Sequence, residues 1–560
     1  MNHFLKIILA LLFVSTTAEA QINITFSGTS ASVIVPESIT DVTYQVNGAD
    51  VIILSTNLTT EYIYTVSGSS SDGSLTINGS YKLTLRLNGV NLTNNHGGAA
   101  IDVECGKRIA VVLVPGTVNT LSDTALGAQK AAFYFSGHPE FEGSGTLNVR
   151  GKLKHAIASK EYMELKSDVG CINVLEAVSD GLHCGKGKVN NEHNYFLMKG
   201  GTVNITNVGG DGVDADDYGV IKIEEGNLNI NVMNNSEGLK ADSILNISGG
   251  NINIAVKGVD SDAMRANYAM MISGGTIDIV LQGDGTKGIK VKNETASTVN
   301  NGGNASISGG TIQILALGDS YVDATNETTK CIGASIDADF TLSGGELHIT
   351  AMGEEAKALN VKGTESIADG CLFTILSPWK VNPYDYQYNM TAYGIVKLNG
   401  TPLEDYTNKI IGVFNGGVCI GIGYFDTPAY GTFRIYSNTA TISNALSFRL
   451  HDYDADYEYG LTPNQTVRFS SDGCVGMPST PIVLSAEMDY YGDVNRDKTV
   501  TISDVVMMVN YILGNTSVGT FYELNADVNT DGIINISDVV ETVNMILGNS
   551  PLRLRIGPIE

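Results

Sequence analysis

Two acidic segments near the end of the chain could hold metal ions: DVNRDKTVTISD, from Asp493, and DVNTDGIINISD, from Asp527. In each, oxygen-bearing side chains stand at positions 1, 3, 5, 9 and 12, and position 7 can add a backbone carbonyl. Such a set of oxygens suits a hard cation, so we predict two Ca²⁺ sites. The predicted ligands are Asp493, Asn495, Asp497, Thr499, Thr501 and Asp504, then Asp527, Asn529, Asp531, Ile533, Asn535 and Asp538.

Charged residues also recur in a six-residue string along the first half of the chain. The copies are HAIASK (His155), DGLHCG (Asp180), DGVDAD (Asp211), EGLKAD (Glu237), DAMRAN (Asp262), KGIKVK (Lys287), KCIGAS (Lys330) and KALNVK (Lys357). Positions 3 and 5 are apolar or small and should face inward, whereas positions 4 and 6 are mostly polar and should face outward.

Stacked on one another, these strings would gather carboxylates and bases on one face. We predict that Asp180, Asp211, Asp214, Asp216 and Asp242 contribute to Ca²⁺ binding, and that Lys240, Arg265, Lys290 and Lys292 bind substrate. A hard cation beside basic side chains suits an anionic sugar polymer, because both would meet its carboxylates. The alternative is a solvated face of mixed charge pairs with no ligand.

The element that must position these strings is itself a repeat. Two glycines followed by alternating apolar residues occur in GGTVNI (Gly200), GGNINI (Gly249), GGTIDI (Gly274), GGTIQI (Gly309) and GGELHI (Gly344). A period of about 25 residues built from short strands and glycine turns is typical of a solenoid. We predict a mainly β fold, a parallel β-helix whose coils stack about 4.8 Å apart.

Composition limits the class of protein. The chain has 560 residues, a formal net charge of −26, 63 glycines and 12 prolines, which indicates two to four mainly β domains. The acidic balance argues against nucleic acid as a partner. Residues 1–20 have the charged, apolar and Ala-x-Ala regions of a signal peptide, and no later stretch could span a membrane, so we expect a secreted protein.

Domain boundaries follow from changes in pattern. We expect the β-helix over residues 21–378, a β-sandwich-like module of short alternating strands over 388–487, and a small α-helical domain over 489–549. Trp379, the only tryptophan, would lie in the linker. Of the seven cysteines, we interpret Cys171, Cys184 and Cys331 as core residues, and leave open whether Cys419 and Cys474 pair.

The C-terminal segment resembles a type I dockerin, since each loop is followed by an apolar helix pattern that ends at Gly514 or Gly548. The resemblance implies two Ca²⁺ ions and a cohesin domain of a scaffold protein as partner. It also implies that Ile502, Ser503, Ile536 and Ser537 choose that partner, and their identity in both copies would permit two binding orientations. Lys498 departs from the family pattern, where glycine is usual.

The region from about Ile22 to Leu376 resembles a family of calcium-containing, right-handed β-helix carbohydrate-binding domains with a pectate-lyase-like fold. The likeness rests on PGTVNTLSD (Pro115–Asp123), KHAIASK (Lys154–Lys160), SDGLHC (Ser179–Cys184) and GGDGVDAD (Gly209–Asp216). It implies binding of plant cell-wall polysaccharide, either cellulose or acidic pectic chains. It also implies Ca²⁺ at Asp180, Asp211, Asp214 and Asp216.

The sequence therefore favours non-catalytic polysaccharide binding with attachment through a dockerin. A second hypothesis is a calcium-dependent polysaccharide lyase with Arg265 or Lys240 as the base. Neighbouring carboxylates would raise the pKa of such a base and make it a poor proton acceptor, which disfavours this hypothesis. A third is a surface adhesin or structural protein that binds no sugar.

Overall fold

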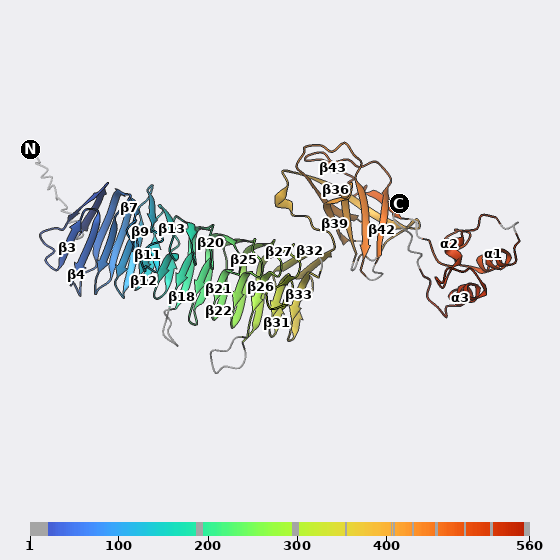
Figure 1. Cartoon of the computed structure of the whole chain (residues 1–560), viewed down its shortest axis with the longest axis horizontal. Helices are drawn as coiled ribbons and strands as arrows, with labels where there is room; N and C mark the ends of the chain where they lie inside the picture. The colour runs from blue at the N-terminus through green and yellow to red at the C-terminus, as the bar shows by residue number, and fades with distance from the viewer. Residues whose placement is uncertain are drawn as a thin grey trace, which may run out of the picture. The chain divides into compact units, whose positions relative to one another are not determined.

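The computed structural model describes residues 21–553 apart from short gaps at 186–193, 234, 294–301, 353–354, 405, 407–408, 428–429, 454–456, 487–488 and 516–518. The chain forms two compact units, Met1–Leu376 and Ser377–Glu560 (Figure 1). The predicted signal peptide lies outside the described residues. None of the described helices is both long and apolar enough to cross a membrane.

The first unit contains a sheet that runs its full length. Within the described residues this sheet has 20 strands. They are β1 (Gln21–Ser27), β2 (Ser30–Ile34), β5 (Tyr62–Ser70), β7 (Leu83–Thr93), β9 (Arg108–Leu113), β10 (Val118–Ser122), β12 (His138–Glu142), β13 (Thr146–Gly151), β15 (Met163–Leu165), β16 (Cys171–Ala177), β18 (Tyr195–Ile205), β20 (Val220–Val232), β22 (Ile244–Ile247), β23 (Asn251–Val256), β25 (Ala269–Leu281), β27 (Asn304–Ala316), β31 (Phe340–Leu342), β32 (Glu346–Met352), β34 (Glu365–Ile367) and β35 (Leu372–Ser377).

A second sheet has 13 strands in the described part of the chain. Because it contains the third strand of each coil, it is called here the third-strand sheet. They are β3 (Val42–Asn47), β4 (Asp50–Ser55), β6 (Ser74–Asn78), β8 (Ile101–Glu104), β11 (Ala131–Phe135), β14 (His155–Ser159), β17 (Leu182–Cys184), β19 (Val213–Ala215), β21 (Glu237–Ala241), β24 (Asp262–Ala266), β26 (Lys287–Val291), β30 (Ile332–Ile336) and β33 (Lys357–Val361). A small hairpin, β28 (Tyr321–Val322) and β29 (Thr328–Thr329), projects from one coil.

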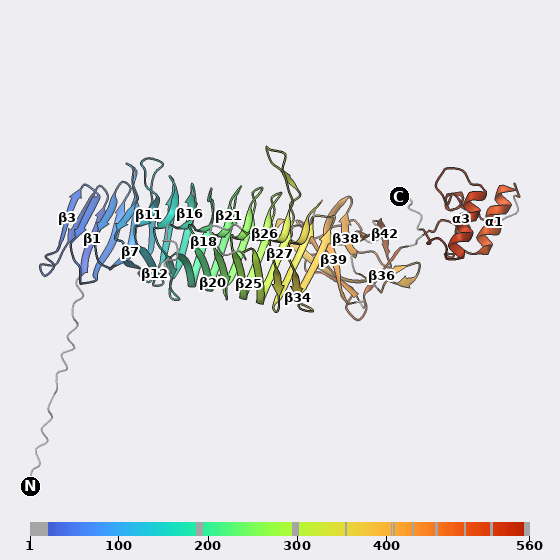
Figure 2. The same ribbon diagram turned by 90° about the horizontal axis from the view of Figure 1, so that it is seen from below.

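Each coil carries three strands, as β20 and β21 illustrate. β20 bends near Gly226, where φ is +104°. The part before the bend pairs with β22 and the part after it pairs with β23, so β20 supplies two strands of its coil. β21 follows as the third strand. Equivalent strands of successive coils pair in parallel (Figure 2). Each coil thus includes a first strand that the sequence strings did not identify.

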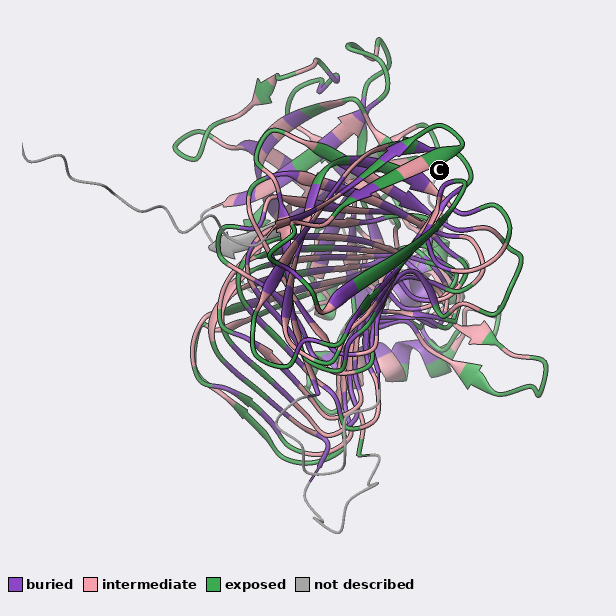
Figure 3. Cartoon of the chain, turned by 90° about the vertical axis from the view of Figure 1, so that its left-hand side faces the viewer, coloured by how far each residue is buried: buried purple, intermediate pink, exposed green. Residues whose placement is uncertain are grey.

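The interior of the stack is a set of apolar ladders. Ile205, Ile230, Ile254, Ile279 and Ile314 pair in register along the second strands, and each is at most 3% exposed. Inward and outward residues alternate along these strands (Figure 3). Burial of one such side chain stabilises the fold by about 1.5–3 kcal/mol, so the repeated isoleucines supply much of the driving force for stacking.

The glycines at the bend are required by the close approach of neighbouring coils. A Cβ on Gly249 would lie 2.2 Å from the carbonyl oxygen of Glu224, and one on Gly274 would lie 2.4 Å from that of Ser248. Neither gap admits a carbon atom. The two-glycine string therefore marks a corner where the backbones of adjacent coils approach too closely for any side chain.

The predicted alignment of one copy of the six-residue string is wrong. We aligned KCIGAS with Lys330 at position 1, but Lys287 pairs with Ile332 and Ile289 with Ala334. The string therefore starts two residues later than predicted. The preceding coil carries an insertion that includes the β28–β29 hairpin, so the repeat length no longer indicates the frame there.

The second unit contains a closed barrel where we predicted a β-sandwich-like module. Its strands are β36 (Tyr388–Leu398), β37 (Thr401–Pro402), β38 (Lys409–Asn415), β39 (Val418–Thr427), β40 (Tyr430–Ser437), β41 (Ser447–Asp452), β42 (Tyr457–Pro463), β43 (Cys474–Val475) and β44 (Ile482–Ala486), with a short 3₁₀ helix at Pro383–Asp385. β36 pairs with β40 on one side and with β44 on the other, which closes the sheet on itself. Alternating strands fit a sandwich and a barrel equally well, so the sequence pattern could not separate them.

Trp379 and the cysteines also differ in part from expectation. Trp379 packs edge-on against Phe414 of the barrel, with ring centroids 5.4 Å apart, and is not a free linker residue. All seven cysteines are free thiols, so Cys419 and Cys474 do not pair. Cys184 is buried as predicted, but Cys171 is only half-buried, in an outward row between Thr146 and Thr202.

The last described segment holds three helices, α1 (Ile502–Ile512), α2 (Glu523–Ala526) and α3 (Ile536–Ile546). α1 and α3 begin alike, since Thr501 and Asn535 each accept a hydrogen bond from the backbone N–H two residues later. Both helices are followed by a glycine with positive φ, Gly514 and Gly548, as predicted.

Substitution of a corner glycine should destabilise the coil unit. We expect Gly249→Ala to cost at least about 1–3 kcal/mol, because its Cβ would overlap a backbone carbonyl that cannot move aside. Gly106→Ala is the control, since a Cβ there meets no atom within 4 Å. Calorimetric unfolding of the full chain in excess calcium measures the difference. Equal unfolding midpoints for the two variants would contradict this explanation of the repeat.

Candidate functional site

The outward residues of the third-strand sheet form a charged row, as the sequence predicted. Register places His183, Asp214, Lys240, Arg265 and Lys290 beside one another on β17, β19, β21, β24 and β26. A second row at position 1 includes Glu237, Asp262 and Lys287. Asp180 and Asp211 precede β17 and β19 at the equivalent place.

The bases of this face are engaged in ion pairs with the preceding coil. Lys240 Nζ lies 3.3 Å from Asp211 Oδ2 and 3.1 Å from Asp214 Oδ1. Two further pairs follow the same diagonal, Arg265 with Glu237 at 2.8 Å and Lys290 with Asp262 at 3.2 Å. The predicted substrate-binding bases therefore have intramolecular partners. Lys292 follows β26 and is half-buried on the same side of the unit.

The carboxylates also hold the backbone of the next coil. Asp180 Oδ1 accepts the N–H of Asp211 at 3.0 Å, and Asp211 Oδ1 accepts the N–H of Glu237 at 2.8 Å. Asp242 works in the opposite direction, because its Oδ2 accepts the N–H of Asp217 of the preceding coil at 3.0 Å. These acids thus satisfy backbone donors where the third strands begin or end, which is a structural role in addition to any binding role.

Burial and neighbouring charge shift the titration of this face. Burial, reinforced by a side-chain hydrogen bond with Glu237, raises the pKa of Asp211. Burial also raises the pKa of Asp242, against the opposing effect of Lys240. Burial alone would lower the pKa of Lys240, but Asp214 and Asp211 outweigh it and raise that pKa. A base held in this way is a poor proton acceptor, which disfavours the lyase hypothesis for Lys240.

The predicted calcium ligands converge only in part. Asp180, Asp211 and Asp214 each bring one oxygen within 4.8 Å of the others, and Asp216 joins Asp214 in a separate group. Calcium needs six to eight oxygens, and the ammonium group of Lys240 already lies against two of these carboxylates. The residues present therefore fit a calcium ion poorly on this face.

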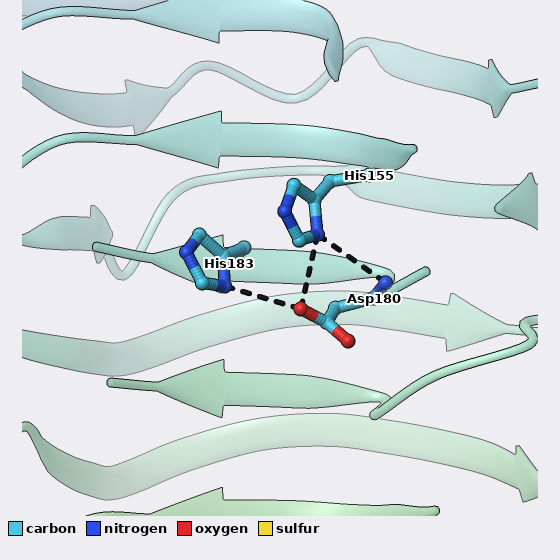
Figure 4. A group of neighbouring side chains, drawn as sticks. All are labelled: His155, Asp180 and His183. Atoms are coloured by element: carbon cyan, nitrogen blue, oxygen red, sulfur yellow. Dashed lines mark hydrogen bonds and ion pairs between the residues drawn. The ribbon is translucent and has the colours of Figure 1, made fainter. Parts of the chain in front are cut away.

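Two histidines complete the face, and the sequence interpretation did not assign them to a site. The rings of His155 and His183 stack with centroids 4.2 Å apart, and both Nδ1 atoms approach Asp180 Oδ2 (Figure 4). Burial lowers the pKa of His155. For His183, Asp180 and Asp214 outweigh burial and raise the pKa to about 9. The sequence could have indicated this pair of histidines, because both occupy polar positions of adjacent strings.

A long groove lies at the two-glycine corner of the coils. It has a volume of about 950 Å³ and crosses six coils. Its wall is one register row of outward residues, namely Thr146, Cys171, Thr202, Asn227, Asn251 and Thr276. Glu225 is the only charged residue among the described residues that line it. The groove therefore offers hydroxyl, amide and backbone groups to a ligand, with almost no charge.

An asparagine ladder runs beside the groove on the same strands. Asn148, Asn173, Asn204, Asn229 and Asn253 stack in register, and each side-chain amide donates to the previous carbonyl at 2.8–2.9 Å. The chain of hydrogen bonds fixes the direction of every amide. An uncharged, ordered polar surface of this kind suits a hydroxyl-rich ligand lying along the stack.

The C-terminal loops adopt the same geometry twice. In the first, Asp493 accepts the N–H groups of Asp497 and Lys498, and Asp504 accepts those of Val494 and Thr501. The second loop repeats this arrangement, in which Asp527 accepts from Asp531 and Gly532, and Asp538 from Val528 and Asn535.

The loops suit the predicted calcium ions. Asp504 and Asp538 are fully buried at the centres of their loops. Burial, together with the nearby Asp504 and Asp497, raises the pKa of Asp493. A divalent cation would compensate this concentration of negative charge, and oxygen ligands at these positions are those that calcium prefers. Thr499 and Ile533 stand at position 7, where a backbone carbonyl would complete each set.

The predicted partner-binding residues are exposed. Ile502 is 66% and Ile536 63% exposed, at equivalent places on α1 and α3. Val505 and Val539 lie in the core, whereas Val506 and Val540 are exposed. Only part of the apolar pattern of each helix is therefore buried. Each helix thus presents the same apolar surface.

Comparisons with known proteins agree with both regions. Residues 47–262 match a family described as carbohydrate-binding domain-containing protein, and residues 491–547 match the dockerin type I domain. No curated protein matches the chain. These matches confirm the predictions of a carbohydrate-binding domain and of a type I dockerin.

One matching solved structure is described as that of the polysaccharide lyase-like protein from C. thermocellum, gadolinium derivative. Its identity to this chain is 19%, and the alignment covers 63% of this chain and 100% of that one. The TM-score is 0.28, so the likeness carries no argument about fold or activity.

Lys498 gives a direct test of the calcium loops. Its φ is +73°, whereas glycine occupies the equivalent place in the second loop, Gly532, with φ +83°. We expect Lys498→Gly to relieve about 1 kcal/mol of backbone strain and to tighten calcium binding at the first loop about fivefold. Gly532→Lys, the matched reverse change, should weaken the second loop by a similar factor. Calorimetric calcium titration measures both, and unchanged affinities would show that this position does not limit binding.

Proposed function

We propose that this protein is a non-catalytic polysaccharide-binding protein that is attached through its dockerin to a cohesin-bearing scaffold. The match of residues 47–262 to a carbohydrate-binding family carries the first part. The match of residues 491–547 carries the second, supported by two calcium-type loops with equivalent exposed helix faces. The same reasoning makes it an exported protein, in agreement with the signal-peptide pattern of residues 1–20.

The coil unit is, in this proposal, a right-handed parallel β-helix. Parallel pairing of equivalent strands and three strands per coil support it. Handedness follows from the general rule that strand connections between parallel strands of one sheet are right-handed.

The glycan lies along the groove at the glycine corner. Six coils at about 4.8 Å per step make a track roughly 24 Å long, which is enough for several sugar units of an extended chain. The groove's threonines and asparagines offer hydrogen-bond donors and acceptors at each step. A linear polymer with a regular repeat suits such a regular row better than a compact ligand does.

Among the two polysaccharide classes that we considered, the groove favours a neutral chain such as cellulose over an acidic pectic chain. A uronate polymer carries one charge per sugar, and Glu225 would repel it. The bases that could bind uronate lie on the third-strand sheet. Lys240, Arg265 and Lys290 are neutralised there by the carboxylates of neighbouring coils.

Calcium, in this proposal, belongs to the dockerin. The acids of the two C-terminal loops repeat one arrangement of hydrogen bonds, whereas Lys240 lies against the carboxylate cluster of the coils. Calcium removal should therefore abolish scaffold attachment and leave glycan binding unchanged.

Groove substitutions test the glycan site. We expect Asn227→Ala combined with Asn251→Ala to weaken binding of a soluble neutral glucan about 5- to 30-fold, since each lost hydrogen bond is worth about 1 kcal/mol. Native gels cast with hydroxyethylcellulose or with polygalacturonate measure retention. Ser335→Ala, on the opposite third-strand sheet, is the control. Retention by polygalacturonate alone, unaffected by the groove variant, would move the site to the charged face.

Dockerin substitutions test attachment. Because α1 and α3 present equivalent faces, Ile502→Asp or Ile536→Asp alone should leave cohesin binding within a few-fold of the unmodified protein. The double variant should lose at least about 2 kcal/mol, roughly 30-fold. Leu524→Asp, equally exposed on α2, is the control. Titration calorimetry against a panel of cohesins measures this. Loss of binding in one single variant would show that only one orientation is used.

A further inference from the structure

The two stacked histidines and Asp180 form a nearly dry cluster that the proposed glycan groove does not use. His155 Nδ1 lies 3.0 Å from Asp180 Oδ2, and His183 Nδ1 lies 3.1 Å from the same oxygen (Figure 4). The three side chains are 4%, 10% and 18% exposed for His155, Asp180 and His183. Three potential metal-binding atoms from two adjacent coils thus point at one place inside the protein.

Asp214, from the next coil, contacts one of these histidines. Its Oδ2 lies 2.9 Å from Nδ1 of His183. Its other oxygen, Oδ1, pairs with Lys240. Asp180 is arranged in the same way, since its Oδ1 accepts the backbone N–H of Asp211, which leaves Oδ2 for the histidines. Outer partners of this kind orient the ligands of metal sites.

Each of these contacts needs a proton or a metal ion between the two atoms, because a neutral imidazole nitrogen without its proton and a carboxylate oxygen are both acceptors. His183 Nδ1 faces two carboxylate oxygens, at 2.9 and 3.1 Å, and has at most one proton to share. His155 Nδ1 is also within 3.3 Å of the N–H of Asp180, for which it would have to act as acceptor. One divalent ion would satisfy both nitrogens and Asp180 Oδ2 together.

The donor set selects a class of ion. Zinc binds imidazole nitrogen and carboxylate oxygen at about 2.0–2.2 Å in a tetrahedron, so its ligands lie roughly 3.3–3.5 Å apart. The contacts of 3.0 and 3.1 Å between the two Nδ1 atoms and Asp180 Oδ2 lie close to this spacing, and one imidazole would turn out of the stack so that both nitrogens face the ion. Calcium prefers more oxygens, at longer distances, and does not favour nitrogen.

We propose that His155, Asp180 and His183 form a binding site for a borderline transition-metal ion of the Zn²⁺ class, with Asp214 as an outer partner of His183. The ion would connect β14 with β17 and the Asp180 that precedes it, on two successive coils of the third-strand sheet. Its role is to fix the stacking of these coils, because an ion that binds only the folded chain shifts the unfolding equilibrium toward it.

Cobalt binding tests the proposal on the full, tag-free chain. Excess Ca²⁺ keeps the dockerin loops filled while Co²⁺ is titrated, and visible absorption reports four-coordinate cobalt. We expect one Co²⁺ per chain, displaced by Zn²⁺ and not by Ca²⁺, with a higher unfolding midpoint when Zn²⁺ is bound. His155→Gln and His183→Gln should each abolish the absorption. His348→Gln, a half-buried histidine of β32, should retain it.

Two results would overturn the site. One is the absence of stoichiometric Co²⁺ or Zn²⁺ binding by the unmodified chain, and the other is unchanged binding in both glutamine variants. Should those variants fail to fold, X-ray absorption of the Zn²⁺-loaded unmodified chain decides. Two imidazole nitrogens in the first shell support the proposal, and a shell of oxygen alone refutes it.

Discussion

The hydrogen bonding of each coil to the next is the constraint on which the first unit depends. Parallel pairing in register places every residue about 4.8 Å from its equivalent in the neighbouring coil. An inward isoleucine therefore meets another isoleucine, which is favourable, but an outward charge meets whatever charge follows it. Like charges directly opposite one another are destabilising. The order of side chains along a row is thus as consequential as their types.

The third-strand sheet and the groove meet this constraint in different ways. On the sheet, Lys240, Arg265 and Lys290 each reach diagonally to a carboxylate of the preceding coil, so repulsion along a row becomes attraction across two rows. Beside the groove, the rows are mostly uncharged. Asparagine can stack on asparagine because its amide is both donor and acceptor, and the ladder from Asn148 to Asn253 does this at every step.

What the sequence predicted well was local. The ligands of the dockerin loops lie within twelve residues of one another, so spacing alone predicts Asp493 and Asp504 on one site, and the register of the strings predicts Asp214 beside Lys240. The rest depends on contacts that spacing does not encode. Lys240 pairs with Asp211 because the two side chains lie diagonally across adjacent coils, and the spacing of the sequence does not show this contact. Closure of the barrel is decided by β36 and β44, which are far apart in the chain. The insertion before β30 moved the frame of the repeat by two residues.

The same constraint argues against the charged face as a site for an acidic polymer. A uronate chain could bind Lys240 or Lys290 only by competing with Asp214 and Asp262, whose side chains are 5% and 4% exposed. Each buried carboxylate would then lose its partner, and breaking a buried pair costs about 3–5 kcal/mol. A sugar carboxylate in water gains much less from a half-exposed lysine, about 0–1 kcal/mol. The exchange is unfavourable at every coil and is repeated along the polymer. In the groove, a neutral chain would have no ion pair to break and only water to displace, which is why we propose the corner of the coils as the glycan site.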